Sequence, residues 1–137
     1  METIVLDKEI HVMYVTATSF PAGVMDAHNK LRTMVPSSPG RRYFGISRPE
    51  NNGGIVYRAG AEELAPNEGA SYNCETLVLK KGKYYCITIH DFMKHLASVG
   101  AAFREIIARP EIDPEGYCVE WYLNDNETVK CMVRLNA

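Results

Sequence analysis

Apolar and polar residues alternate in short runs along most of the chain, and many of these runs are rich in Val, Ile, Thr and Tyr. Alternation with a period of two, in segments bounded by Gly, Pro and Asn, is typical of β-strands that bury one face. The expected strands are residues 10–18, 41–47, 55–62, 74–80, 83–90, 117–123 and 128–135.

Two longer stretches repeat their apolar residues at helical spacing instead. In residues 22–35 the stripe is formed by Val24, Ala27, Leu31 and Met34 or Val35, and the Pro-rich segment 36–40 ends it. Ser19 is expected to cap this helix. The second helix is expected to start at Asp91 as its N-cap and to stop before Pro110, with a stripe of Phe92, Leu96, Val99, Phe103 and Ile106 or Ile107.

The elements therefore follow the order β-α-β-β and repeat it once, in halves of about residues 8–65 and 72–137. Residues 48–54 form a dense turn signal that predicts a hairpin between the strands on either side, and residues 64–71 connect the halves. Two such units predict an α+β fold: one antiparallel sheet, two helices on one face, and a pseudo-twofold saddle on the other.

The length and composition of the chain fit one domain spanning residues 1–137. The net charge is −2 and no Lys/Arg run exceeds two residues, so direct nucleic-acid binding is not expected. No apolar run is long enough to span a bilayer, and the N-terminus has no secretory features. We therefore expect a cytoplasmic protein without membrane contact.

The four cysteines, Cys74, Cys86, Cys118 and Cys131, lack the close spacing of zinc and redox motifs, and they are expected to be reduced core thiols. Cys86, Cys118 and His90 could be imagined as metal ligands, but they have no local chelate spacing. We expect neither a metal nor an organic cofactor.

Three segments carry a resemblance to a known family: Lys80-Lys-Gly-Lys-Tyr-Tyr85, the following His90-Asp-Phe before the second helix, and Tyr117-Cys-Val-Glu-Trp-Tyr122. In order and spacing they are similar to the bacterial transcription-activator effector-binding family, also called GyrI-like domains. The resemblance implies a ligand cleft between the halves, where an acidic residue among aromatic side chains holds cationic planar compounds. Regulators of this family carry an N-terminal helix-turn-helix, and only residues 1–9 precede the first expected strand here.

Strand alternation sorts the candidate site residues. Cys118, Glu120 and Tyr122 share one face, which we expect to be the cleft face, because a carboxylate under the helices would be buried without a partner. Tyr84 is expected on that same cleft face, and Trp121 on the helix side unless a bulge turns it. The candidate ligand-binding residues are Glu120, Tyr122, Tyr84, Tyr57, Phe44 and Trp121.

Each candidate has a simpler interpretation. Glu120 could be a surface residue paired across strands with Lys130 or Arg134, and the tyrosines could form ordinary cross-strand pairs. If Glu120 is recessed among aromatic rings, burial would raise its pKa, and it could pair with a ligand cation or act as a general acid.

The favoured function is binding of a small, partly apolar, cationic or aromatic molecule by a stand-alone sensor or sequestering protein. The alternative, which the resemblance to stand-alone members of the family implies, is a hydrolase that opens reactive electrophiles such as cyclopropane-bearing alkylators, with Glu120 as acid or base and a tyrosine as its partner. A third possibility, also implied by the resemblance, is a protein-interaction role such as inhibition of a DNA topoisomerase. The expected partner is a small-molecule ligand, with a homodimer or a regulatory protein partner as further possibilities.

Overall fold

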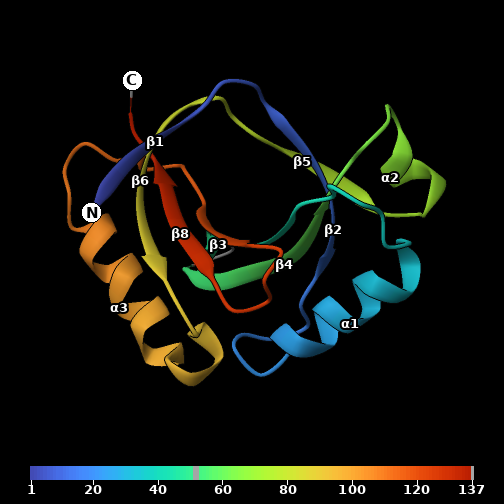
Figure 1. Ribbon diagram of the computed structural model, residues 1–137, viewed down its shortest axis with the longest axis horizontal. Helices are drawn as coiled ribbons and strands as arrows, with labels where there is room; N and C mark the ends of the chain where they lie inside the picture. Colours follow the sequence, from blue (N-terminus) through green and yellow to red (C-terminus); the bar gives the residue numbers. More distant parts are fainter. Residues whose placement is uncertain (51–52, 137) are drawn as a thin grey trace.

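The computed structural model describes residues 1–50 and 53–136, and all of its strands form one curled antiparallel sheet (Figure 1). The strands are β1 (Glu2–Leu6), β2 (Ile10–Thr16), β3 (Tyr43–Glu50), β4 (Gly54–Glu62), β5 (Glu75–Leu79), β6 (Gly82–Ile89), β7 (Cys118–Tyr122) and β8 (Val129–Arg134). The helices are α1 (Val24–Met34), α2 (Glu68–Ser71), α3 (Leu96–Ile107) and a 3₁₀ turn, η1 (Phe92–Lys94). The α+β class expected from the sequence is confirmed.

The strand order β1-β6-β8-β7-β3-β4-β2-β5 is symmetric about the junction of β7 and β3. Each half contributes its first strand to the other half: β1 pairs with β6, and β5 pairs with β2. β1 was not predicted from the sequence, because this edge strand buries only Leu6 and shows little alternation. The exchanged strands curl the sheet into a half-barrel.

The predicted hairpin of β3 and β4 is confirmed by their antiparallel pairing from Tyr43↔Ala61 to Glu50↔Gly54. β3 continues through Arg48, Pro49 and Glu50, which were expected to belong to the turn segment 48–54. Two residues of that predicted turn, Asn51 and Asn52, lie outside the described residues.

Helices α1 and α3 lie on the same face of the sheet, each over its own half: α1 packs on β2 and β4, and α3 on β6 and β8 (Figure 1). The two predicted caps were wrong. Asp91 adopts a left-handed conformation (φ 51°) ahead of η1, so α3 starts only at Leu96. The N-cap residue of α1 is Gly23, not Ser19. The N–H of Gly23 donates to the backbone carbonyl of Ser19, and no side chain caps the helix. No helix of the described residues is long and apolar enough to cross a membrane.

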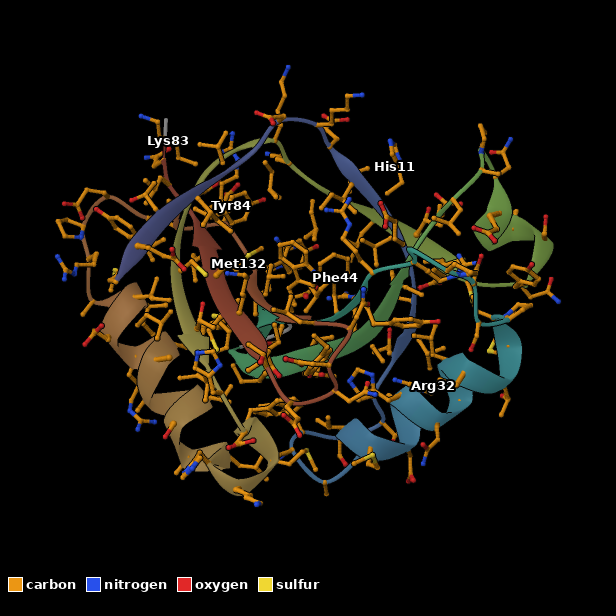
Figure 2. The ribbon with its side chains drawn as sticks, viewed as in Figure 1. His11, Arg32, Phe44, Lys83, Tyr84 and Met132 are labelled. Atoms are coloured by element: carbon orange, nitrogen blue, oxygen red, sulfur yellow. The ribbon has the colours of Figure 1, made fainter. Side chains whose placement is uncertain are left out.

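The inside of the curl, on the face opposite α1 and α3, is packed with apolar side chains. Phe44, Met132 and Tyr84 lie within it (Figure 2), with Ile46 and Val119 beside them. All are less than a tenth exposed, so this face of the sheet is core and not an open saddle.

The connector between the halves is held by a buried ion pair. The guanidinium of Arg41 donates to both carboxylate oxygens of Glu68 in α2, at 2.9 and 2.8 Å, and to the backbone oxygen of Glu62 at 2.7 Å. Arg41 is only 4% exposed, so this bidentate contact replaces the water that the guanidinium loses on folding. It fixes the connector against the end of β4.

Candidate functional site

Glu120 lies on β7, one of the two central strands, and its side chain points to the face that carries α1 and α3. The expectation that this face lies opposite the helices was wrong. Because α1 covers β2 and β4 while α3 covers β6 and β8, the central strands β3 and β7 lie between the helices. The carboxylate is therefore half-buried, and it has a hydrogen-bond partner in Tyr122 that was not predicted from the sequence.

A chain of hydrogen bonds connects Glu120 to helix α1. The Tyr122 hydroxyl donates to Glu120 Oε1 at 2.7 Å, and the Tyr57 and Tyr122 hydroxyl oxygens are 3.0 Å apart. His28 Nε2, on α1, lies 2.7 Å from the Tyr57 hydroxyl. Four polar groups from three elements that are distant in sequence thus form one continuous network in a low-dielectric region.

Aromatic rings surround this chain. Phe20, in the loop before α1, stacks on Tyr57 with ring centroids 5.9 Å apart, and Phe92, in the turn before α3, contacts Tyr122 at 5.5 Å. The His28 ring packs edge-on against both tyrosines. Phe20 is 46% exposed, so the cluster opens to solvent on this side.

Gly45 of β3 makes room for the network. It pairs directly with Glu120, and a Cβ built at this position would overlap the Tyr57 hydroxyl and lie 2.9 Å from the Tyr122 hydroxyl oxygen. Real Cβ atoms do not approach other atoms so closely, so the hydroxyls of both tyrosines can meet above β3 only if residue 45 has no side chain.

Burial dominates the electrostatics of the site. It raises the pKa of Glu120 above its usual value, although the hydrogen bond from Tyr122 acts in the opposite direction. Burial, together with the positive charge of Arg32, lowers the pKa of His28 to about 4, so this imidazole is neutral at neutral pH. The pKa values of Tyr57 and Tyr122 are raised by burial and by the charge of Glu120.

Two cysteines flank the carboxylate on the same face. Burial, with the negative charge of Glu120, raises the pKa of Cys118 to about 11 and that of Cys131 to about 12. Both are therefore neutral thiols and not nucleophiles at neutral pH. Among the described residues, no group of three or more His, Cys, Asp or Glu side chains is arranged to hold a metal ion.

The structure divides the candidate residues between two faces of the sheet. Glu120, Tyr122 and Tyr57 meet on the helix face, whereas Phe44, Tyr84 and Trp121 lie on the opposite face, in or against the core of the curl. The placement of Tyr84 beside Glu120 and of Trp121 on the helix side was wrong for one reason: the face assigned to Glu120 was inverted. The Tyr84 hydroxyl donates to the backbone oxygen of Lys80, and burial raises its pKa to about 12.

The suggested cross-strand ion pairs of Glu120 do not form. Lys130 pairs with Glu2 and Arg134 with Asp113, and both cations lie on the face opposite Glu120. Two surface hollows, of about 600 and 220 Å³, lie beside α2 and at one end of the curl, and neither is lined by Glu120. Neither hollow is lined by the rings of the aromatic cluster.

Three residues of this site were not predicted from the sequence: His28, Gly45 and Phe20. For His28 a signal existed, because it lies four residues after Val24 and three before Leu31 and so belongs to the apolar stripe of α1. For Gly45 and Phe20 no pattern in the sequence distinguished them, since their contacts join strands and loops that only the fold brings together.

No protein-family model matches the chain, and no curated protein matches it. Solved structures do share its fold. An integron cassette protein from the mobile metagenome of Vibrio cholerae is 14% identical with a TM-score of 0.70, over 98% of this chain and 95% of the other. A protein ascribed to bacterial transcription regulation from Staphylococcus aureus is 12% identical with a TM-score of 0.57, over 97% of each chain. A hydrolase from Listeria innocua is 11% identical with a TM-score of 0.56, over 98% and 90%. At these identities the likeness shows the fold, and that fold is consistent with the GyrI-like architecture expected from the sequence.

Proposed function

We propose that the protein binds a small, partly apolar molecule that carries a positive charge or an aromatic ring, at the aromatic cluster around Glu120. The observation that carries this proposal is a half-buried carboxylate without a cationic partner among the described residues. Its one hydrogen-bond donor there is the neutral Tyr122 hydroxyl. The likeness to a transcription-regulation protein supports the proposal at the level of the fold.

Burial of an unpaired charge costs several kcal/mol, and one hydrogen bond from a neutral donor offsets only part of this cost. A ligand cation would supply the missing partner. Tyr122 occupies only Oε1, and within residues 1–50 and 53–136 no donor reaches Oε2. That second oxygen is therefore the atom that we assign to the ligand's positive group.

The surrounding rings suit the apolar part of such a ligand. The half-exposed Phe20 stacks on the ring of Tyr57, and Phe92 contacts the ring of Tyr122. The two tyrosines meet through their hydroxyls. Contact between a cation and an aromatic face contributes about 0.5–2 kcal/mol. A planar guest would take over the face of Tyr57 on which Phe20 now stacks.

The test is a fluorescence titration with acridine orange, a planar cationic dye, on the wild type and on Glu120→Gln. Gln keeps the shape and the hydrogen-bond acceptor but loses the charge, which is worth about 1.5–3 kcal/mol, so we expect affinity to fall about ten-fold or more. Glu111→Gln, which removes an exposed glutamate of the loop after α3, is the matched control and should bind like the wild type.

The pH dependence has a definite sign. Protons compete with the cation for Glu120, whose pKa is raised, so affinity should weaken as pH falls through that raised pKa. Equal affinity of the wild type and Glu120→Gln, at all pH values, would exclude the carboxylate as the ligand's partner.

Hydrolysis is the second candidate function, and the Glu120–Tyr122 contact of 2.7 Å is the observation that favours it. A carboxyl with a raised pKa can deliver a proton to a leaving group while a neighbouring phenol orients the substrate. Incubation with a cyclopropane-bearing alkylator, with ring opening followed by absorbance, tests it. Turnover that disappears in Glu120→Gln supports it; a rate equal to that in buffer excludes it for this substrate class.

A further inference from the structure

The number of hydrogens in the network from Glu120 to His28 limits how its hydrogen bonds can be arranged. Each tyrosine hydroxyl has one hydrogen, so it can donate to one neighbour only and accepts from the other. The three contacts, of 2.7, 3.0 and 2.7 Å, form an unbranched chain of four groups. The chain therefore has only two fully hydrogen-bonded arrangements.

In the first arrangement Glu120 is ionised and every hydrogen points towards it. Tyr122 donates to the carboxylate, Tyr57 donates to the Tyr122 oxygen, and the Nε2–H of His28 donates to the Tyr57 oxygen. In the second arrangement Glu120 is protonated and every hydrogen points away from it. Glu120 donates to Tyr122, Tyr122 to Tyr57, and Tyr57 to an unprotonated Nε2, so that the imidazole hydrogen is on Nδ1.

We propose that His28 is a positioning residue of the Glu120 site: the ionisation of Glu120 sets which nitrogen of the His28 ring carries the proton, through the hydroxyls of Tyr57 and Tyr122. This inference rests on the proposed function in one respect: it takes the binding of a ligand cation as the event that ionises Glu120. Binding of the cation then places the proton of His28 on Nε2 and orients both tyrosine hydroxyls towards the carboxylate.

The proton balance is simple. When the cation arrives, the carboxyl proton passes to Tyr122 as Tyr122 passes its own to Tyr57 and Tyr57 passes its own to Nε2. His28 then releases its Nδ1 proton to water, since α1 leaves this residue partly exposed. One proton leaves and one ligand charge enters, so the network itself carries one negative charge, which the positive charge of the ligand balances.

Few other charges face the network, which keeps the two arrangements well defined. In the described part of the chain, the titratable and charged neighbours are Cys118 on β7, Cys131 on β8, Tyr43 on β3, which lies opposite Tyr122, and Arg32 on α1. The thiols stay neutral, and an arginine side chain is a fixed positive charge in proteins. Towards α3 the contact is made by the uncharged ring of Phe92. Because burial also keeps His28 neutral down to about pH 4, where its pKa lies, its two tautomers are both accessible in the range in which Glu120 titrates.

Long-range ¹H–¹⁵N correlation spectra of the imidazole nitrogens test the inference on the ligand-free protein. As pH rises through the ionisation of Glu120, we expect the His28 signals to change from the Nδ1–H form to the Nε2–H form. In Tyr57→Phe, which cuts the chain, this change should disappear. Tyr84→Phe removes a buried hydroxyl on the opposite face and should leave the change intact.

A His28 tautomer that stays constant while Glu120 titrates would overturn the inference; it would mean that Glu120 takes its proton on Oε2 and that Tyr122 donates to Oε1 at every pH. The same spectra with acridine orange at low pH separate the two proposals. Dye binding without a tautomer change excludes the role of His28 and leaves the binding function. A tautomer change with pH but no binding of the dye supports the role of His28 and counts against the binding function.

Discussion

Replacement of Gly45 by Ala is the most direct test of how tightly the sheet, the tyrosines and Glu120 are packed. The new methyl would overlap the Tyr57 hydroxyl and lie 2.7 Å from its Cζ atom and 2.9 Å from the Tyr122 hydroxyl oxygen. Tyr57 has no easy way out, because it is 1% exposed and is held by Phe20 on one side and His28 on the other.

The magnitude is the balance of three terms. Overpacking of a tight site costs about 1–3 kcal/mol, and loss of the Tyr57–Tyr122 hydrogen bond costs about 1 kcal/mol more. Replacing Gly by Ala in a strand returns about 0.5–1 kcal/mol, because the unfolded chain has less freedom to lose. We therefore expect Gly45→Ala to lower the free energy of unfolding by about 2 kcal/mol.

Urea unfolding followed by circular dichroism measures this difference. The matched control is Gly54→Ala, at the exposed start of β4, where a Cβ meets no atom of the described residues within 4 Å. The control should remain within about 0.5 kcal/mol of the wild type or be slightly more stable. If both variants unfold at the wild-type urea concentration, Gly45 is not what allows the tyrosine hydroxyls to meet.

Three further outcomes follow from the charges. Glu120→Gln should be at least as stable as the wild type at pH 8, because burial raises the pKa of Glu120 and its ionised form weakens the fold as pH rises. The difference in stability should vanish below about pH 4, where the carboxyl is protonated in both the folded and the unfolded chain. A variant that is less stable than the wild type at pH 8 would contradict this. His28 acts in the opposite direction: on acidification its contribution to the free energy of unfolding should fall, by up to about 3 kcal/mol, between the unfolded His pKa of about 6.5 and the folded pKa of His28, about 4, since the unfolded chain binds the proton first. His28→Gln should remove this contribution from the pH profile, and a profile identical to that of the wild type would exclude the assignment. In urea unfolding, Arg41→Ala should cost about 3 kcal/mol, because it removes the cation that pairs with Glu68 at a buried contact. Arg42→Ala, whose ion pair is more exposed, should cost about 1 kcal/mol or less, and equal costs would refute the role of burial.

Local pattern was enough to predict most elements, because each signal lies within one strand or helix. The apolar residues of 83–90 and the stripe of 22–35 mark β6 and α1 within a few residues of their observed bounds. The errors fall where local and tertiary preferences differ. Asp91 is a good cap by composition, yet the chain needs a left-handed residue and a 3₁₀ turn there before α3 can start. The edge strand β1 has few buried positions to reveal it.

By itself the sequence determined which residues share a face: Cys118 with Glu120 and Tyr122, and Tyr84 with Cys86, because side-chain direction alternates along any strand. It also singled out Glu120 as a candidate, and the proposed function keeps this carboxylate as the partner of the ligand. Only the tertiary structure decided which face the helices cover, since that depends on where α1 and α3 pack relative to the central strands. It likewise decided that His28, Tyr57 and Tyr122 meet Glu120, because hydrogen bonds between residues distant in the chain depend on distances in space, which no period along the sequence encodes.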